Sequence, residues 1–277
     1  MHASLDSPCA VPAWAGGRVS PFARCVLADN PSAMTYTGTN TWVLSQPGSR
    51  AAVLIDPGPS SRKHFEAVEH ACQEDRLDIG AIVLTHGHPD HSEGATEASR
   101  RWGAPVFSRS HENLAEGPFQ PVDAGPLFEV VYLPGHSSDS VGICFPLDRS
   151  IATGDLVFAQ SPTVICWPDG TLQDYFESLR RVKALVREGS YLRLLSAHGP
   201  PVENPLTDIS LAEAHRFKRL AQVRGAIHRG GTIDVEHLAQ AVYDDVDARL
   251  DLATRANIQA QIDYLFAIDD PCVAGHT

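Results

Sequence analysis

The sequence predicts a layered domain of mixed sheets and helices, followed by a small helical appendix. Three observations favour this fold class. Short apolar runs that end at Gly, Pro, Asp or His fill the first two-thirds of the chain, helical segments lie between them, and only helical stretches follow residue 210. The chain has 277 residues, of which 43% are hydrophobic, which is enough to bury a core. We expect an α/β or α+β domain over residues 1–209 and a helical unit over 210–277.

The strand-like runs are short and end in polar residues. They cover residues 51–58, 79–86, 128–135, 141–145 and 192–198. Helices are expected at 63–76, 92–102 and 172–187, since apolar residues there recur at helical spacing or follow capping residues. Three more helices are expected in the appendix, at 210–228, 234–243 and 248–266.

The charge balance excludes some classes of partner. Twenty-two Lys and Arg against 34 Asp and Glu give a net charge of −12, so a dedicated DNA-binding protein is not expected. No run approaches the roughly 18 consecutive apolar residues of a membrane span, and residues 1–14 lack the pattern of a signal peptide. We therefore expect a cytoplasmic protein with no membrane contact. The oligomeric state is left open.

Histidine is the unusual component of this chain. Four metal-ligand residues lie within six positions, in the pattern H-x-H-x-D-H formed by His86, His88, Asp90 and His91. A shuffled sequence of this composition would contain the pattern roughly twice in a thousand trials, so chance is a poor explanation. The pattern indicates a metal site.

The spacing suggests how one segment can begin two metal sites. In a chain that leaves a strand, His86 and His88 project to the same side and can reach one ion. Pro89 suits the first turn of a helix, which would direct Asp90 and His91 to a second position nearby. Three further candidates follow at strand ends: His136, Asp155 and His198.

This set of residues, in this order, resembles the metallo-β-lactamase superfamily over about residues 38–205. The resemblance implies an α+β fold, a four-layer αββα sandwich with a dinuclear centre at one edge. Carried over, the first ion would be held by His86, His88 and His136, the second by Asp90, His91 and His198, with Asp155 bridging both. Asp56 matches the early aspartate of the superfamily and is expected to contact a ligating imidazole.

The appendix and two other segments point to one branch of the superfamily. Residues 38–44, 174–179 and 198–223 resemble the group represented by β-lactamase-like protein 2, which carries a small winged-helix-like domain at its C-terminus. The group includes a single-stranded-RNA endonuclease and thioesterases that release polyketides from a carrier protein. Because β-lactam-hydrolysing enzymes usually have no aspartate between their two ions, a true β-lactamase is not expected.

Five imidazoles and two carboxylates favour two divalent ions, with Zn²⁺ expected and Mn²⁺ or Fe²⁺ as alternatives. The first hypothesis is a hydrolase that attacks an ester, thioester or related acyl bond, in a small or carrier-bound substrate, with a metal-bridged hydroxide. Asp90 has a second, catalytic candidate role, in orienting that hydroxide and transferring its proton. The alternatives are a phosphodiesterase on single-stranded RNA and a non-catalytic metal-binding interaction protein.

A basic stretch in the first appendix helix supplies the candidate substrate-binding residues. His215, Arg216 and Arg219 could face the cleft, and a phosphate of RNA, of coenzyme A or of a pantetheine arm would suit the arginines. A solvent-exposed face is favoured for the basic stretch, and a surface position is favoured for His215.

Overall fold

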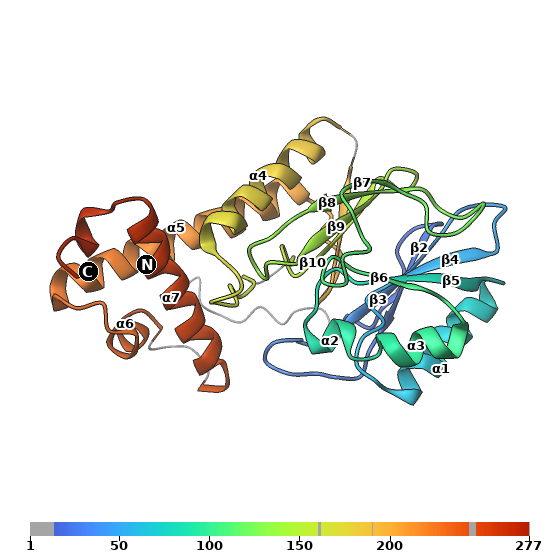
Figure 1. Ribbon diagram of the computed structural model, residues 1–277, viewed down its shortest axis with the longest axis horizontal. Helices are drawn as coiled ribbons and strands as arrows, with labels where there is room; N and C mark the ends of the chain where they lie inside the picture. The colour runs from blue at the N-terminus through green and yellow to red at the C-terminus, as the bar shows by residue number, and fades with distance from the viewer. Residues whose placement is uncertain (1–13, 160–161, 190, 244–247, 277) are drawn as a thin grey trace, which may run out of the picture.

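Two mixed β-sheets pack face to face, helices cover their outer faces, and further helices extend from one end of the sandwich (Figure 1). The computed structural model describes residues 14–159, 162–189, 191–243 and 248–276. The order of the layers is helix, sheet, sheet, helix, which confirms the predicted four-layer α+β sandwich with a helical C-terminal region.

The first sheet contains six strands in chain order: β1 (Gly17–Arg18), β2 (Ala23–Leu27), β3 (Asn40–Ser45), β4 (Ala51–Ile55), β5 (Asp78–Val83) and β6 (Val106–Phe107). The pairs from β1 to β4 are antiparallel, while β4, β5 and β6 run parallel. Helices α1 (Arg62–Glu74) and α3 (Ala95–Trp102) cover its outer face. Parallel strands need such crossover helices, because a tight turn cannot connect them.

The helix predicted over 92–102 is α3, which begins three residues later than expected, and a separate short helix, α2 (Pro89–Ser92), precedes it. The break lies at Gly94, whose N–H donates to the carbonyl of Gly58. A Cβ at Gly94 would lie 2.8 Å from that oxygen. This close approach, which the helical pattern does not reveal, separates the turn that carries Asp90 and His91 from the helix that packs on the sheet.

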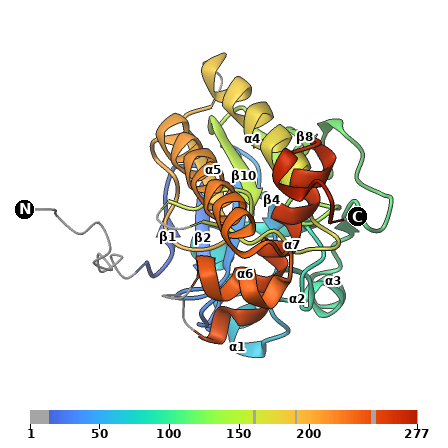
Figure 2. The same cartoon turned by 90° about the vertical axis from the view of Figure 1, so that its left-hand side faces the viewer.

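The second sheet has the order β11 (Arg193–Ser196), β10 (Ser150–Gly154), β9 (Val141–Phe145), β8 (Phe128–Tyr132), β7 (Gly117–Phe119). Only β10 and β11 pair in parallel. Helix α4 (Leu172–Arg187) covers the outer face over the predicted range, and the long helix α5 (Pro205–Gly230) lies beside it (Figure 2). The main core lies between the two sheets, around Trp42, Phe128 and Phe145.

The tail continues through α6 (Val235–Val242), the short η1 (Ala248–Leu250), α7 (Asp251–Ala267) and η2 (Pro271–Val273). Between residues 205 and 276 the described residues, which exclude 244–247, form no strand, so the wing of a winged helix stays a prediction. Helix α5 begins before the expected domain boundary at 209/210 and runs through it, and the division into two domains also stays a prediction. Within the described ranges, no helix has the length and hydropathy needed to cross a membrane.

The two sheets bring several strand ends to one edge of the sandwich. β4, β5, β10 and β11 all end there, and a bridge between Thr39 and His198 joins the sheets. The N–H of Asn40 also donates to the carbonyl of Ala197, at 2.7 Å. Residues that directly follow these strands therefore meet in space although they are far apart in the sequence.

Candidate metal centre

All seven metal-ligand candidates lie at this edge of the sandwich. His86 follows β5, His88 is the N-cap residue of α2, and Asp90 and His91 lie in its first turn. The other three come from the second sheet, where His136 follows β8, Asp155 follows β10 and His198 follows β11. The structure thus brings together every residue that the sequence analysis selected for a metal site.

The seven side chains form three overlapping groups of three. Within each group, the ligand atoms lie within 4.8 Å of one another. The groups are His86, His88 and His136; His86, His91 and Asp155; and Asp90, His91 and His198. The first and third correspond to the two sets that the superfamily resemblance implies. Within the first, His88 Nδ1 lies 2.9 Å from His136 Nε2, so two nitrogen lone pairs can converge on one ion.

Asp155 lies between these two sets. Its Oδ1 is 3.4 Å from His91 Nε2 and 3.5 Å from His198 Nε2. Its Oδ2 is 3.6 Å from His136 Nε2. Each oxygen of one carboxylate therefore faces a different ligand set, as a bridging ligand requires.

Four imidazoles have their Nδ1 atoms engaged outside the centre, which directs Nε2 inward. The Nδ1 contacts are His86 with Thr85 Oγ1 at 3.1 Å, His91 with Asp56 Oδ2 at 2.9 Å, His136 with the Val164 carbonyl at 2.7 Å, and His198 with the Gly38 carbonyl at 3.2 Å. A carbonyl can only accept, so His136 and His198 carry a proton on Nδ1, which leaves Nε2 as the nitrogen that could bind a metal ion.

Asp56 makes the contact with a ligating imidazole that the sequence analysis expects. Its carboxylate also accepts from the backbone N–H and the hydroxyl of Thr85, both at 2.7 Å. The backbone of Asp56 is left-handed, with φ of 52°, a conformation that a non-glycine residue adopts only when its surroundings enforce it. Asp56 therefore orients His91 and at the same time holds the turn that leads to His86.

The charges and the unpartnered atoms of the site suit divalent cations. His86 Nε2, His91 Nε2 and Asp155 Oδ1 are buried and have no hydrogen-bond partner among the described residues, a state that costs about 1–3 kcal/mol for each atom. Burial raises the pKa of the Asp155 carboxyl, but His198 and His91 outweigh it and hold that pKa well below its usual range. A deprotonated carboxylate among imidazoles is a donor set that fits two divalent ions.

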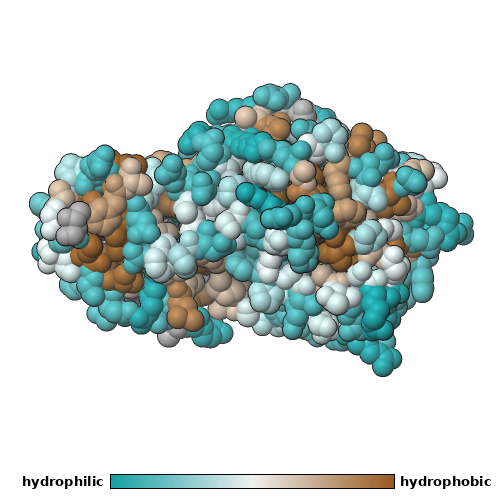
Figure 3. Space-filling model, in the orientation of Figure 1, coloured by the Kyte–Doolittle hydropathy of each residue, from teal (hydrophilic) through white to brown (hydrophobic). Residues whose placement is uncertain are grey.

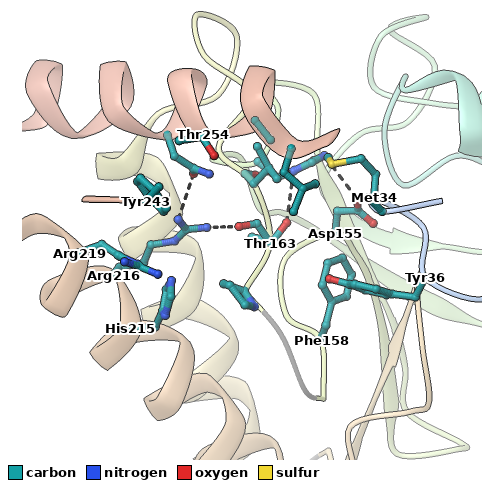
Figure 4. Close-up of a pocket in the computed structure, with 17 residues that line it drawn as sticks. Met34, Tyr36, Asp155, Phe158, Thr163, His215, Arg216, Arg219, Tyr243 and Thr254 are labelled. Atoms are coloured by element: carbon teal, nitrogen blue, oxygen red, sulfur yellow. Dashed lines mark hydrogen bonds and ion pairs between the residues drawn. The ribbon is translucent and has the colours of Figure 1, made fainter. Parts of the chain in front are cut away.

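A cavity of about 240 Å³ opens beside Asp155 and His136. Figure 4 shows Met34, Tyr36, Asp155 and Phe158 on one side of it, while His215, Arg216 and Arg219 approach from α5. Thr254 and Asn257 of α7 complete the far wall. The tail helices therefore form half of the pocket, as the three substrate-binding candidates require.

The two sequence-based preferences about the tail have different outcomes. In the basic stretch Lys218, Arg224 and Arg229 are exposed as expected, whereas Arg216 is only 3% exposed. His215 is half-buried and lines the pocket rather than the surface, where burial and the neighbouring Arg216 and Arg219 lower its pKa to about 4. Tertiary packing against α7 and residues 163–165 turns this side of α5 inward.

Sequence reasoning missed several residues that support the site. Thr39, in the 38–44 segment for which no site role was predicted, places Oγ1 at 3.4 Å from Asp90 Oδ2. The carbonyls of Gly38 and Val164 carry no signal in the sequence, because any residue supplies one. Asn257 is 93 positions from Val164, the nearest of these residues, and no spacing pattern marks it.

A two-sheet sandwich with this His and Asp cluster at its edge defines the class, a metal-dependent hydrolase. Residues 34–125 match the family model described as Metallo-beta-lactamase superfamily, so this part of the chain is similar to the domain of that family. The match includes the H-x-H-x-D-H motif and ends before His136.

Relatives and solved structures agree with this assignment. The chain is 24% identical over 255 residues to the Beta-lactamase-like protein 2 homolog of Caenorhabditis elegans, which covers 87% of this chain and 83% of the relative. It is 29% identical over 216 residues to the Atrochrysone carboxyl ACP thioesterase of Aspergillus fumigatus, and this match covers 74% of this chain and 64% of the relative. A beta-lactamase domain protein from Burkholderia ambifaria superposes with a TM-score of 0.72 at 19% identity, over 92% of this chain and 88% of that one.

Proposed function

We propose that this hydrolase cleaves acyl esters or thioesters, including acyl groups borne on a carrier, at a two-ion centre. His86, His88 and His136 would hold one ion, Asp90, His91 and His198 the other, and Asp155 both. The observation that carries the proposal is the position of Asp155, whose two oxygens face the two sets from 3.4 to 3.6 Å. When bound, two divalent ions lower the pKa of water and polarise the scissile carbonyl.

The side chains around the ions supply the rest of the chemistry. Asp90 Oδ2 lies 3.3 Å from His198 Nε2, and 30% of the Asp90 side chain is exposed, so this carboxylate contacts both the cluster and the solvent. We assign Asp90 the transfer of a proton from the attacking water to the leaving group. The hydroxyl of Thr39, near the same oxygen, would restrict its orientation.

The lining of the pocket favours an acyl substrate. Met34, Tyr36, Phe158 and Val164 make an apolar wall next to Asp155. Such a wall suits a hydrophobic acyl group, with its carbonyl directed at the cluster. The thioesterase name of the Aspergillus relative supports the same substrate class.

One experiment distinguishes this proposal from the two alternatives, an RNA phosphodiesterase and a non-catalytic metal-binding protein. For single-stranded RNA, an exposed basic path would be expected, whereas Arg216 is buried and Arg219 donates to the Val242 carbonyl. A non-catalytic binding protein would hold ions without turnover. Zn²⁺ is proposed as the native metal, with Mn²⁺ or Fe²⁺ as alternatives, since imidazole and carboxylate accept all three.

The test measures bound metal and turnover on acyl thioesters, esters and single-stranded RNA for the wild type and the Asp155→Asn variant. An amide oxygen has no charge to share between two ions, so we expect the variant to retain one ion or fewer. We expect kcat/KM on the best thioester to fall by about a thousandfold, equivalent to about 4 kcal/mol of transition-state stabilisation.

Asp29→Asn is the matched control, because Asp29 pairs with Lys63 on the surface at 2.8 Å and is 72% exposed. This variant should match the wild type in metal content and rate. Two bound ions together with wild-type turnover in Asp155→Asn would contradict the bridging role. Turnover of RNA without thioester turnover would contradict the proposed substrate class.

A further inference from the structure

We infer that Arg216 is a positioning residue for His136: it holds the backbone segment whose carbonyl orients that imidazole, and so links the tail helices to the metal centre. The inference rests on the proposed metal centre. It concerns an arginine for which the chemistry of the site itself provides no role.

The last step of this link is the contact that orients His136. Its Nδ1–H donates to the carbonyl of Val164 at 2.7 Å, which leaves Nε2 facing Asp155. The N–H of Cys166 also donates to the carbonyl of His136 at 3.0 Å. Residues 163–166 therefore control both the ring and the backbone of one candidate ligand.

The tail helices hold this segment on both sides of Val164. Arg216 of α5 donates through Nη2 to the carbonyl of Thr163. Asn257 of α7 accepts from the N–H of Ile165 at 3.1 Å, and the same Oδ1 accepts from Arg216 Nη1 at 3.0 Å. The Val164 carbonyl thus lies between two anchored residues, and one guanidinium ties both anchors together (Figure 4).

The burial of Arg216 supports a positioning role for its guanidinium. The guanidinium belongs to a residue that is 3% exposed, yet the acceptors it has among the described residues are a carbonyl and an amide, with the Tyr175 ring 5.3 Å away. Burying a cation against neutral partners costs desolvation free energy, so stability alone does not account for this arginine. The planar guanidinium of Arg216 connects α5 with α7 and with the loop that contains Thr163, and these contacts position Val164.

The experiment measures Zn²⁺ affinity by competition with a chelator for the wild type and for Arg216→Met. We expect one ion per chain to keep wild-type affinity and the other, at the His136 set, to bind about tenfold more weakly. With Co²⁺ in place of Zn²⁺, the absorption spectrum of the variant should change in position or intensity. A role that only stabilises the fold would move neither signal.

Arg224→Met is the matched control, since Arg224 lies on the same helix and pairs with Asp270, away from residues 163–166. It removes another contact of the same helix and should leave both Zn²⁺ affinities unchanged. Equal weakening in the two arginine variants, or two wild-type affinities in Arg216→Met, would overturn the inference. A wild-type protein that binds no Zn²⁺ at all would instead overturn the proposed function.

Asn257 provides a second test if Arg216→Met fails to fold. Asn257→Asp keeps the oxygen that accepts from Ile165 and Arg216 and should retain both affinities, whereas Asn257→Ala removes it and should weaken one site. Identical affinities in these two variants would contradict the link through Asn257.

Discussion

At the scale of single residues, one hydrogen-bond partner decides what each histidine can do. The ring of His64 is an example outside the metal centre. The hydroxyl of Thr41 donates to the carbonyl of Asp56 at 2.7 Å, so His64 Nε2 must donate to that hydroxyl at 2.8 Å. His64 Nδ1 is buried and has no partner in the part of the chain that the structure describes, and burial lowers the pKa of the ring to about 4. His64 therefore supports the backbone of Asp56 as a neutral side chain.

This neutral ring predicts sensitivity to acid. Between pH 6.5 and 4 the unfolded chain binds a proton at His64 and the folded chain does not, so stability falls as the pH falls through this window. Between pH 7 and 5 the loss attributable to His64 is about 2 kcal/mol. Urea unfolding at pH 7 and at pH 5 measures the free energy of unfolding of each protein. When the pH falls from 7 to 5, this free energy should decrease less in His64→Gln than in the wild type, by about 2 kcal/mol.

His70→Gln serves as the control, because the His70 side chain is 72% exposed. Its stability should change with pH in parallel with the wild type. If the free energy of unfolding of His64→Gln depends on pH as it does in the wild type, the assignment of a neutral, buried His64 is wrong.

At the scale of elements, the ends of the strands determine the geometry of the site. β10 ends at Gly154, whose φ is +51°, and a Cβ there would lie 2.6 Å from Thr85 Oγ1 at the end of β5. Thr85 in turn donates to Asp56 and contacts His86. The turn before Asp155 therefore packs directly on the turn before His86, and a larger residue would push them apart.

Gly154→Ala should for this reason reduce both stability and metal binding. We expect a loss of about 1–3 kcal/mol in the free energy of unfolding from backbone strain and displacement of Thr85. Elemental analysis should find fewer than two ions per chain. Gly103→Ala separates the two effects, since Gly103 has φ of +64° and open space around it. It should lose stability only, and full metal content in both variants would argue against the packing role of Gly154.

At the scale of the whole molecule, the tail helices share one apolar cluster with α4 and the second sheet. Phe176 of α4 stacks on Phe217 of α5, with centroids 4.8 Å apart, and meets Tyr264 of α7 at 5.5 Å. Some apolar surface remains visible over the tail in Figure 3. Two exposed apolar side chains of the tail helices are Phe217 and Leu252, at 50% and 82%. The tail is therefore both a wall of the pocket and part of the core of the molecule.

A chain that ends at Asn204 should not fold cooperatively. Removing α5 to α7 would expose Phe176 and its neighbours in this cluster and would free residues 163–165 from Arg216 and Asn257. We expect strong binding of a hydrophobic dye, a broad thermal transition and loss of at least one ion. A sharp transition with two bound ions would instead support residues 1–209 as an independent domain.

The part of the structure that the sequence predicted is the part that depends on short-range spacing. The H-x-H-x-D-H motif lies on a strand end and a helical turn because period-two and first-turn geometry are local properties. Helix 172–187 was predicted over its full range, since its apolar face and its cap at Thr171 are both readable in the sequence.

Long-range packing decided the rest. The break of the 92–102 segment at Gly94 depends on contact with Gly58, and the inward orientation of Arg216 depends on Thr163 and Asn257. Such contacts join residues tens of positions apart and leave no periodic trace in the sequence. The sequence by itself determined which side chains can bind metal. Only the tertiary structure decided which carbonyls orient them and that the tail encloses the pocket, because backbone groups are identical in every residue and acquire a role only through folding.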